Sequence, residues 1–379
     1  MAVVELPLTA TFEYLAEGAA NIVYRFSLPP PSPNIEADAA LHDYEDGRST
    51  PPPSELPALH HDPIFEHKLL RLRKVLPSTT SVLVSQEKFE QRIRPLIPSE
   101  YLVQQTLVKL PPDLQADCNR NLGLMEQAET RPRKRHGTYL AVDVIYGSLV
   151  TDMTPAGNQG SVVIEFKPKW LAQSPSAPAG SRRCRTCALR AMRKASSTYK
   201  DTLSSDHRLQ CAPLNLCPLD LVSEDSHRVR LAVKAIMDDS KCPPSIRSWV
   251  EYRLAEFFTG SPIICLLQSL QQQLDPKGIL QVDTNNPEFL TATTLRDCTM
   301  FVVVPSQGYG DVHARLGDLD WKTPGGRKAE YWLDTERRLI DEGWYTGTEE
   351  SATRRNGVDP DEKACHSQVG SSMSSRQVK

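Results

Sequence analysis

The chain has 379 residues, which corresponds to about two domains at roughly 150 residues each. Its 44 Lys and Arg residues against 47 Asp and Glu residues give a net charge of −3, which excludes a generally basic nucleic-acid binder but not a local basic pocket. Hydrophobic residues make up 39%, enough for a core, and the 30 prolines indicate irregular insertions in an ordered protein.

In the first half of the chain, residues 11–28 have strand–turn–strand character, and residues 29–63 form a Pro-rich, acidic stretch that predicts a disordered insertion. Regular structure is predicted to resume with a strand, a helix and two further strands, at 65–76, 86–97, 139–150 and 161–166.

The second half is predicted to be mostly helical, with helices at 184–200, 224–239, 245–259 and 263–275. Two strands and a last helix follow at 298–304, 314–319 and 328–343, and residues 348–379 are predicted to be a disordered tail. The helix at 245–259 is expected to turn one apolar face to the core, formed by Trp249, Tyr252, Leu254, Phe257 and Phe258.

The cysteine pattern does not indicate a disulfide framework. The nine cysteines are irregularly spaced, no run of about 18 apolar residues predicts a transmembrane helix, and the N-terminus does not match a secretory signal. A nuclear or cytoplasmic chain with mostly unpaired thiols fits this pattern best. Cys184-x-x-Cys187, with Cys211 and Cys217, leaves a structural zinc site as an alternative, although the spacing matches no known finger.

Two features of the N-terminal half suit a nucleotide, and each also has a simpler interpretation. The small-residue turn Glu17-Gly18-Ala19-Ala20-Asn21 lets backbone N–H groups approach a phosphate, although a plain hairpin turn would look the same. Arg71-x-Arg73-Lys74 places cations on the next strand, as in kinase-like folds, or simply forms a solvated edge strand.

Cations and carboxylates then recur at strand ends in the C-terminal half. In Glu165-Phe166-Lys167-Pro168-Lys169, two lysines project to one side of an extended chain, where a polyanion would relieve their repulsion. Basic runs at 131–135 and 182–194 flank this segment and suggest a pocket for a densely anionic ligand, or alternatively a nuclear-localisation or nucleic-acid patch. Asp297 precedes a strand, and Asp318-Leu319-Asp320 follows one with both carboxylates on one face, positions typical of a base and of Mg²⁺ ligands, or of turn and cap residues.

Taken in order, these motifs resemble the inositol-pentakisphosphate 2-kinase family. The counterparts of the family's motifs are Glu17–Asn21, Arg71–Lys74, Glu165–Lys169, Cys184–Cys187, Pro218–Ser223 (PLDLVS), Asp297–Thr299 and Asp318–Lys322. The loop holds less glycine than the family's, the usual asparagine pair is replaced by the segment 242–247, and the plant-type zinc site has no visible counterpart.

The resemblance implies an α+β, two-lobed protein-kinase-like fold. Residues 1–150 would form a nucleotide-binding N-lobe with an antiparallel sheet and helices, and residues 151–347 a larger mixed C-lobe that binds the inositol phosphate and carries catalysis. It also implies ATP and Mg²⁺ as cofactors and phosphorylation of the 2-hydroxyl of inositol 1,3,4,5,6-pentakisphosphate, which gives the hexakisphosphate.

Roles follow position by position from the resemblance. Asp297 would be the catalytic base, with Lys167 beside it, and Asp318 with Asp320 would bind Mg²⁺. ATP would contact Glu17, Gly18, Ala19, Ala20, Asn21, Arg71, Asp152 and Glu165. The substrate phosphates would contact Arg135, Lys167, Lys169, Arg185, Lys322, Arg327 and Tyr331.

Two other classes of function stay open at this point. One is a non-catalytic inositol-phosphate-binding scaffold on the same fold. The other is a nucleic-acid-associated protein that uses the basic run at 182–194, although this run lacks interleaved aromatic residues for base stacking. For the kinase we expect a monomer in the nucleus or cytoplasm, with neither membrane nor nucleic acid as a partner.

Overall fold

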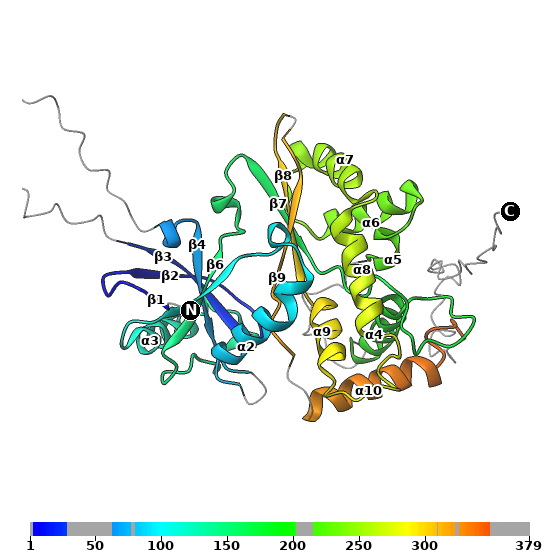
Figure 1. The fold of residues 1–379 in the computed structure, drawn as a ribbon, viewed down its shortest axis with the longest axis horizontal. Coiled ribbons are helices and arrows are strands. Elements are labelled where there is room, and N and C mark those ends of the chain that lie inside the picture. The colour runs from blue at the N-terminus through cyan, green and yellow to red at the C-terminus, as the bar shows by residue number, and fades with distance from the viewer. Residues whose placement is uncertain are drawn as a thin grey trace, which may run out of the picture. The chain divides into compact units, whose positions relative to one another are not determined.

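A computed structural model describes residues 3–28, 63–76, 80–201, 215–308, 310–322 and 326–348 (Figure 1). The predicted insertion at 29–63, apart from Pro63, and the predicted tail, apart from Thr348, lie outside these residues. The chain divides into two compact units, one formed by Met1–Gln86 and Gln104–Asp152 and the other by Glu87–Val103 and Met153–Lys379. Among the described helices, none has the length and apolar character needed to cross a bilayer.

The first unit is built on a six-stranded sheet in the order β1-β5-β6-β4-β3-β2. Its strands are β1 (Val4–Glu5), β2 (Thr11–Glu17), β3 (Asn21–Ser27), β4 (Lys68–Arg73), β5 (Gln105–Lys109) and β6 (Tyr146–Thr151). Neighbouring strands run antiparallel except β1 and β5, which are parallel, so the sheet is not purely antiparallel as predicted.

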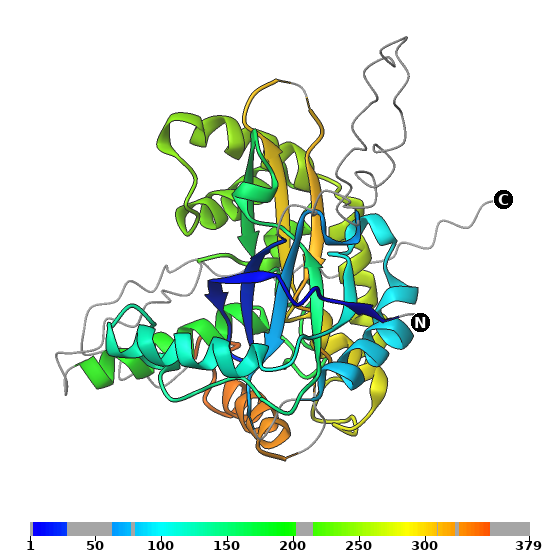
Figure 2. The same cartoon turned by 90° about the vertical axis from the view of Figure 1, so that its left-hand side faces the viewer.

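Helix α3 (Leu114–Gln127) covers this sheet, and the teal helix lies across the strands in Figure 2. Its Leu114, Cys118 and Leu122 pack with Ile22 and Leu70. Ile22 alternates with more exposed neighbours along β3, whereas Leu69 and Leu70 of β4 are both buried. Gly147 permits this packing, because a Cβ there would lie 2.9 Å from the Leu72 side chain.

The second unit combines a three-stranded antiparallel sheet with most of the helices. The strands are β7 (Ser161–Phe166), β8 (Thr299–Pro305) and β9 (His313–Gly317), in that order. The helices are α4 (Arg185–Asp201), α5 (Pro218–Leu221), α6 (Ser226–Asp238), α7 (Arg247–Phe258), α8 (Pro262–Leu274), α9 (Pro287–Leu295) and α10 (Gly326–Asp341). Helices α5 to α8 lie together beside the strands in Figure 1, and their apolar side chains share one core with β7 and β8.

Residues 87–103 are counted with this second unit although they precede part of the first one in the chain. Helix α2 (Val82–Lys88) passes into a π-helical turn at Phe89–Ile93 and a 3₁₀ turn at Arg94–Leu96. The segment then docks on β9, where the Val103 N–H donates to the Leu316 carbonyl at 2.9 Å.

The predicted α+β class is confirmed, and the predicted elements correspond to observed ones with shifted boundaries. The strand predicted at 139–150 is shorter, because β6 begins only at Tyr146. The core face predicted at 245–259 is partly wrong. Val250, Leu254 and Phe258 are the buried positions of α7, whereas Tyr252 is 59% exposed. The sequence reading missed β1, β5, α3, α5 and α9 altogether.

Candidate active site

Three chain segments meet at one end of the three-stranded sheet of the second unit. Because β8 runs antiparallel to both neighbours, the end of β7, the start of β8 and the end of β9 fall at the same edge, with Phe166 opposite Met300 and Thr299 opposite Gly317. Lys167 directly follows β7, Asp297 lies just before β8, and Asp318 directly follows β9. The register of the sheet therefore brings together residues that are far apart in the sequence.

Three lysine ammonium groups converge on the Asp297 carboxylate. Lys322 Nζ lies 2.7 Å from Asp297 Oδ2, Lys169 Nζ lies 3.0 Å from Oδ1, and Lys167 Nζ lies 3.5 Å from Oδ1. Lys167 also donates to the Asp297 carbonyl at 2.7 Å and to Asp318 Oδ2 at 2.8 Å. Lys167 thus bridges the two carboxylates that the sequence singled out.

These contacts decide the ionisation of the cluster. Burial raises the pKa of Asp297, but the charges of Lys322, Lys169 and Lys167 outweigh it and hold the pKa well below its ordinary range. Burial lowers the pKa of Lys167, but Asp318 and Asp297 outweigh it and the net shift is upward. The lowered pKa leaves Asp297 ionised at neutral pH. Its side chain is 42% exposed, so a ligand can reach the carboxylate.

The backbone that carries Lys169 is held by the side chain of one glutamine. Lys169 adopts a left-handed φ of 60°, which few non-glycine residues tolerate unless the surroundings impose it. Gln271, fully buried on α8, donates to the Lys169 carbonyl at 2.9 Å and accepts from the Leu171 N–H at 2.9 Å. Gln271 therefore positions Lys169 without contacting Asp297.

Asp297 is fixed from the other side through its neighbour Arg296. The Arg296 guanidinium lies 3.6 Å from the centroid of the Trp170 ring and donates to Asp275 Oδ2 at 2.6 Å. Since Trp170 directly follows Lys169, the stack of the buried Arg296 on Trp170 anchors the segments that present both Lys169 and Asp297.

We expect Gln271→Leu to lower kcat about tenfold, because the lost hydrogen bonds loosen the segment that presents Lys169. It should also raise the pH at which activity falls on the acid side, since a less well-held ammonium depresses the Asp297 pKa less. Gln268→Leu is the matched control, because Gln268 donates to the Leu171 carbonyl on the same segment and does not touch Lys169 in the described structure. Equal pH profiles for both variants would contradict the positioning role.

The sequence predicted Asp318 and Asp320 on one face of an extended chain, but the backbone is not extended at Asp318. Asp318 has a left-handed φ of 54°, so the chain turns sharply between β9 and the following segment. The Asp318 carboxylate is 47% exposed beside Lys167, and Asp320 is partly buried. Carboxylate oxygens are the ligand type that Mg²⁺ prefers, so the exposed Asp318 carboxylate fits a magnesium ligand.

Arg185 lies in a buried network instead of an open basic surface. Its Nε donates to Glu336 Oε2 at 2.7 Å, and its guanidinium lies 4.5 Å from the centroid of the Trp170 ring. Ser174 and Tyr345 also donate to the Glu336 carboxylate, at 2.7 and 2.6 Å. Burial and this partner set favour a structural role for Arg185 over the predicted contact with substrate.

The remaining predicted residues of this unit fall on β7 and α10. Glu165 is on β7, where desolvation by the surrounding protein raises its pKa and the neighbouring Lys167 opposes that shift. The Tyr331 hydroxyl accepts a hydrogen bond from Arg193 at 3.3 Å, which lowers its pKa. Arg327 belongs to α10, and its side chain lies outside the described part of the chain.

In the first unit, the turn Glu17–Asn21 joins β2 to β3 as predicted, but the Glu17 side chain points into the protein. Its carboxylate accepts from Arg131 Nε and Nη2, both at 2.9 Å, and pairs with the buried Lys74 ammonium. Burial raises the pKa of Glu17, but the hydrogen bonds from Arg131 and Lys74 lower it below its ordinary value. Within the turn, the Gly18 N–H donates to the Asn21 carbonyl at 2.9 Å. The Glu17 carboxylate and the Gly18 N–H, both predicted nucleotide contacts, are thus engaged within the protein.

Lys74 also holds the backbone of the turn. Its Nζ donates to the Gly18 carbonyl at 3.0 Å, and its N–H donates to the Ala20 carbonyl at 2.9 Å. The sequence reading chose Arg71 as the nucleotide cation and missed this role of Lys74. The other predicted contacts of this unit are spread over separate elements. Arg71 Nη2 donates to Gln105 Oε1 at 3.3 Å, and Arg135 lies on a 3₁₀ turn. The Asp152 N–H donates to the His67 carbonyl at 2.8 Å.

We expect Arg131→Met to destabilise the first unit by about 3–5 kcal/mol, because it leaves the buried Glu17 carboxylate and the partly buried Glu126 carboxylate with one cation fewer. The Arg131 side chain is fully buried, whereas Arg133, two residues on, forms an exposed ion pair with Glu129. Arg133→Met should therefore change stability by less than about 0.5 kcal/mol. Urea unfolding followed by far-ultraviolet circular dichroism compares Arg131→Met with Arg133→Met. Equal unfolding midpoints for the two variants would contradict the role of Arg131.

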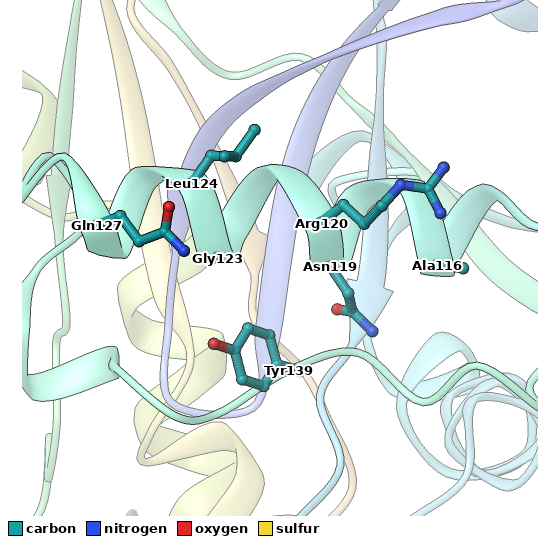
Figure 3. A pocket seen from close by; sticks show the side chains of 7 residues that line it. All are labelled: Ala116, Asn119, Arg120, Gly123, Leu124, Gln127 and Tyr139. Carbon is teal, nitrogen blue, oxygen red and sulfur yellow. The ribbon is translucent and has the colours of Figure 1, made fainter.

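A shallow pocket beside α3 contains none of the predicted site residues. It is lined by Ala116, Asn119, Arg120, Gly123, Leu124, Gln127 and Tyr139 (Figure 3). Asn119 uses its amide on the Leu140 backbone, accepting at 2.9 Å and donating at 3.0 Å, and Tyr139 donates to Glu126 at 2.9 Å. These side chains hold the 139–140 segment against α3, so the pocket has a structural explanation.

The site holds an ionised, reachable carboxylate among three ammonium groups, beside a second carboxylate suited to a metal. This is the arrangement of a phosphotransferase with a polyanionic acceptor. Comparison with known proteins agrees with this class. The sequence profile described as inositol-pentakisphosphate 2-kinase matches residues 14–338. The inositol-pentakisphosphate 2-kinase of Yarrowia lipolytica is 31% identical over 290 residues, which cover 73% of this chain and 85% of that protein. The chain belongs to the inositol-pentakisphosphate 2-kinase family.

Proposed function

We propose that this protein transfers the γ-phosphoryl group of ATP to the 2-hydroxyl of inositol 1,3,4,5,6-pentakisphosphate, with Asp297 as the base. The convergence of Lys167, Lys169 and Lys322 on the Asp297 carboxylate is the observation that carries the proposal. Family membership supplies the enzyme class, and this cluster supplies the residues.

The acceptor makes the lysines necessary. Five phosphate groups at about −1.5 to −2 each give the substrate roughly eight to ten negative charges at neutral pH. The net charge of the whole chain is −3, so attraction must come from a local concentration of cations. The lysines of the cluster provide such a concentration next to the group that would accept the hydroxyl proton.

The step itself needs alignment and charge more than covalent chemistry. The acceptor hydroxyl donates its proton to Asp297 as its oxygen bonds to the γ-phosphorus and the bond to the ADP oxygen breaks. A weak base suffices because the transition state is loose. The attacking oxygen has then formed little of its bond to phosphorus, so the hydroxyl does not need to be deprotonated beforehand. Lys167 lies between Asp297 and Asp318 and therefore faces the region where charge moves.

Asp318 is the proposed Mg²⁺ ligand, and the partly buried Asp320 is a second candidate. When bound, the ion would neutralise charge on the β- and γ-phosphates of ATP. The nucleotide would meet the backbone of the 17–21 turn and the cation Arg71, with Asp152 toward the adenine. Arg135, Tyr331 and Arg327 remain candidates for outer phosphates.

The proposal is tested by incubating the full chain with Mg²⁺-ATP and inositol 1,3,4,5,6-pentakisphosphate and separating the products by anion-exchange chromatography. We expect hexakisphosphate together with one equivalent of ADP. Binding of the pentakisphosphate without turnover would favour a scaffold instead. Salt-dependent retention of RNA on a filter, without any effect of the pentakisphosphate, would favour a nucleic-acid partner.

A further inference from the structure

Two guanidinium groups lie over the ring of one tryptophan in the second unit. The guanidinium carbon of Arg296 is 3.6 Å from the centroid of the Trp170 ring, and that of Arg185 is 4.5 Å from the same centroid. The two arginines belong to different elements, since Arg185 begins α4 and Arg296 follows the last residue of α9. Like charges repel, so both cations need the negative face of the ring and further partners to stay there.

Each arginine is almost completely buried and has a buried carboxylate of its own. Arg296 Nη1 donates to Asp275 Oδ2 at 2.6 Å, and Arg185 Nε donates to Glu336 Oε2 at 2.7 Å. The two cations and two anions balance each other around a neutral ring. A planar guanidinium can pair with a carboxylate and stack on an aromatic face at the same time, which a lysine ammonium cannot do.

The Trp170 ring does more for Arg296 than fill space. Arg296 Nη2 donates to the Gln271 carbonyl at 3.2 Å, whereas the buried Nε makes no hydrogen bond within the described part of the chain. The ring offers this side of the guanidinium the negative face of its π system. An aliphatic side chain at position 170 would leave a buried N–H without any compensation.

The stack connects three parts of the proposed site. Trp170 directly follows Lys169, and Arg296 directly precedes Asp297. Through the carboxylate that pairs with the second arginine, the stack also reaches α10, the helix that carries the candidate phosphate contact Tyr331. A shift of the ring would therefore move the lysine, the carboxylate and this helix relative to one another.

We propose that Trp170 is a positioning residue, which fixes Lys169 relative to Asp297 by holding two guanidinium groups over its ring. This role rests on the proposed function, in which Asp297 is the base and Lys169 binds an acceptor phosphate. Removing the ring leaves every charged group of the site in the chain and changes only where the groups lie. Misplacement by about 1 Å is enough to slow a reaction about a hundredfold.

The kinetic test compares two substitutions of Trp170. Trp170→Leu should lower kcat about a hundredfold and leave the KM for ATP unchanged, because the acceptor side alone is misplaced. Trp170→Phe keeps an aromatic face for the guanidinium groups and should recover most of the lost activity. A Trp170→Phe variant as slow as Trp170→Leu, or a Trp170→Leu variant with the wild-type kcat, would overturn the proposal.

Trp249→Leu is the matched control. Arg253 lies over the Trp249 ring at 5.2 Å, so this tryptophan also carries an arginine. Its indole N–H donates to the Pro305 carbonyl at 3.0 Å, at the end of β8 remote from Asp297. Trp249→Leu should therefore leave kcat unchanged, and equal losses of kcat in Trp249→Leu and Trp170→Leu would reduce Trp170 to a general contributor to stability.

A binding measurement separates this role from the reaction. In calorimetric titration with inositol 1,3,4,5,6-pentakisphosphate, Trp170→Leu should bind about tenfold more weakly than Trp170→Phe, because Lys169 is no longer held in place. Equal affinities would overturn the proposal. If Trp170→Leu does not fold, Arg296→Lys replaces it, since the lysine keeps the charge beside Asp275 and loses the stacking plane.

The same titration shows which proposal fails. A wild-type chain that binds the pentakisphosphate without turnover would refute the proposed function, and the calorimetric comparison would then decide the role of Trp170. A wild-type chain that neither binds nor phosphorylates the pentakisphosphate would overturn both.

Discussion

Replacing Asp297 with asparagine is expected to lower kcat by about a hundred- to ten-thousand-fold, because the amide cannot accept the proton of the acceptor hydroxyl. The side chain keeps nearly the same shape, so lost activity reports lost chemistry. ATP binding should change little, which is measured by calorimetric titration of the variant with Mg²⁺-ATP.

Asp239→Asn makes the same chemical change at an exposed helix end outside the cluster and should leave kcat unchanged. Normal 2-kinase activity in Asp297→Asn would refute the assignment of the base. A parallel loss of ATP affinity would place Asp297 among the nucleotide contacts instead.

The acid limb of the kcat/KM profile gives an independent check on the same residue. A base acts only when ionised, so its contribution is lost as pH falls through its pKa in the free enzyme. Since Lys322, Lys169 and Lys167 hold the pKa of Asp297 below its ordinary range, titration of Asp297 should leave activity intact down to about pH 4. An activity loss that is centred near pH 6 and disappears in Asp297→Asn would contradict this ionisation state.

Replacing Lys167 with methionine is expected to lower kcat/KM for the inositol phosphate by about a hundred- to a thousand-fold. The variant removes the ammonium that contacts both Asp297 and Asp318, at 3.5 and 2.8 Å, and with it a cation for the substrate phosphates. We expect the KM for the inositol phosphate to rise far more than the KM for ATP. Steady-state kinetics with each substrate varied in turn separates the two.

The same variant should also move the pH dependence. With one of three flanking charges gone, the Asp297 pKa rises, so the acid limb of the profile shifts to higher pH. Lys234→Met, at an exposed position on α6, removes a lysine without touching the cluster and should do neither. Equal increases in both KM values, with an unmoved acid limb, would mean that Lys167 acts elsewhere.

The residues of the lysine–carboxylate cluster around Asp297 could be predicted from the sequence. Lys167, Asp297 and Asp318 each stand at the end of an apolar strand, and strand ends of one sheet share an edge. The sequence did not show which edge they share, because the register of β8 against β7 depends on contacts between residues more than 100 apart in sequence.

The residues that hold the cluster and the turn in place could not be predicted from the sequence, because they too are distant in the chain. Nothing in the local pattern of α8 marks Gln271 as the partner of the Lys169 carbonyl, 102 residues away. Glu17 was predicted to face a phosphate, but the turn gave no sign of its pairing with Arg131, 114 residues away. Local spacing predicted the presence of charged groups, whereas their partners depended on the packing of distant segments.

The lysine cluster has a consequence for how such an enzyme would favour transfer to the acceptor over hydrolysis of ATP by water. Before an acceptor arrives, the carboxylates of Asp297 and Asp318 occupy the ammonium groups that substrate phosphates would engage. An arriving inositol phosphate competes for these lysines, and the competition weakens their field at Asp297 and makes it a better proton acceptor. Water brings no phosphate to compete. On the proposed roles, the acceptor itself switches on the base, and idle hydrolysis of ATP stays slow.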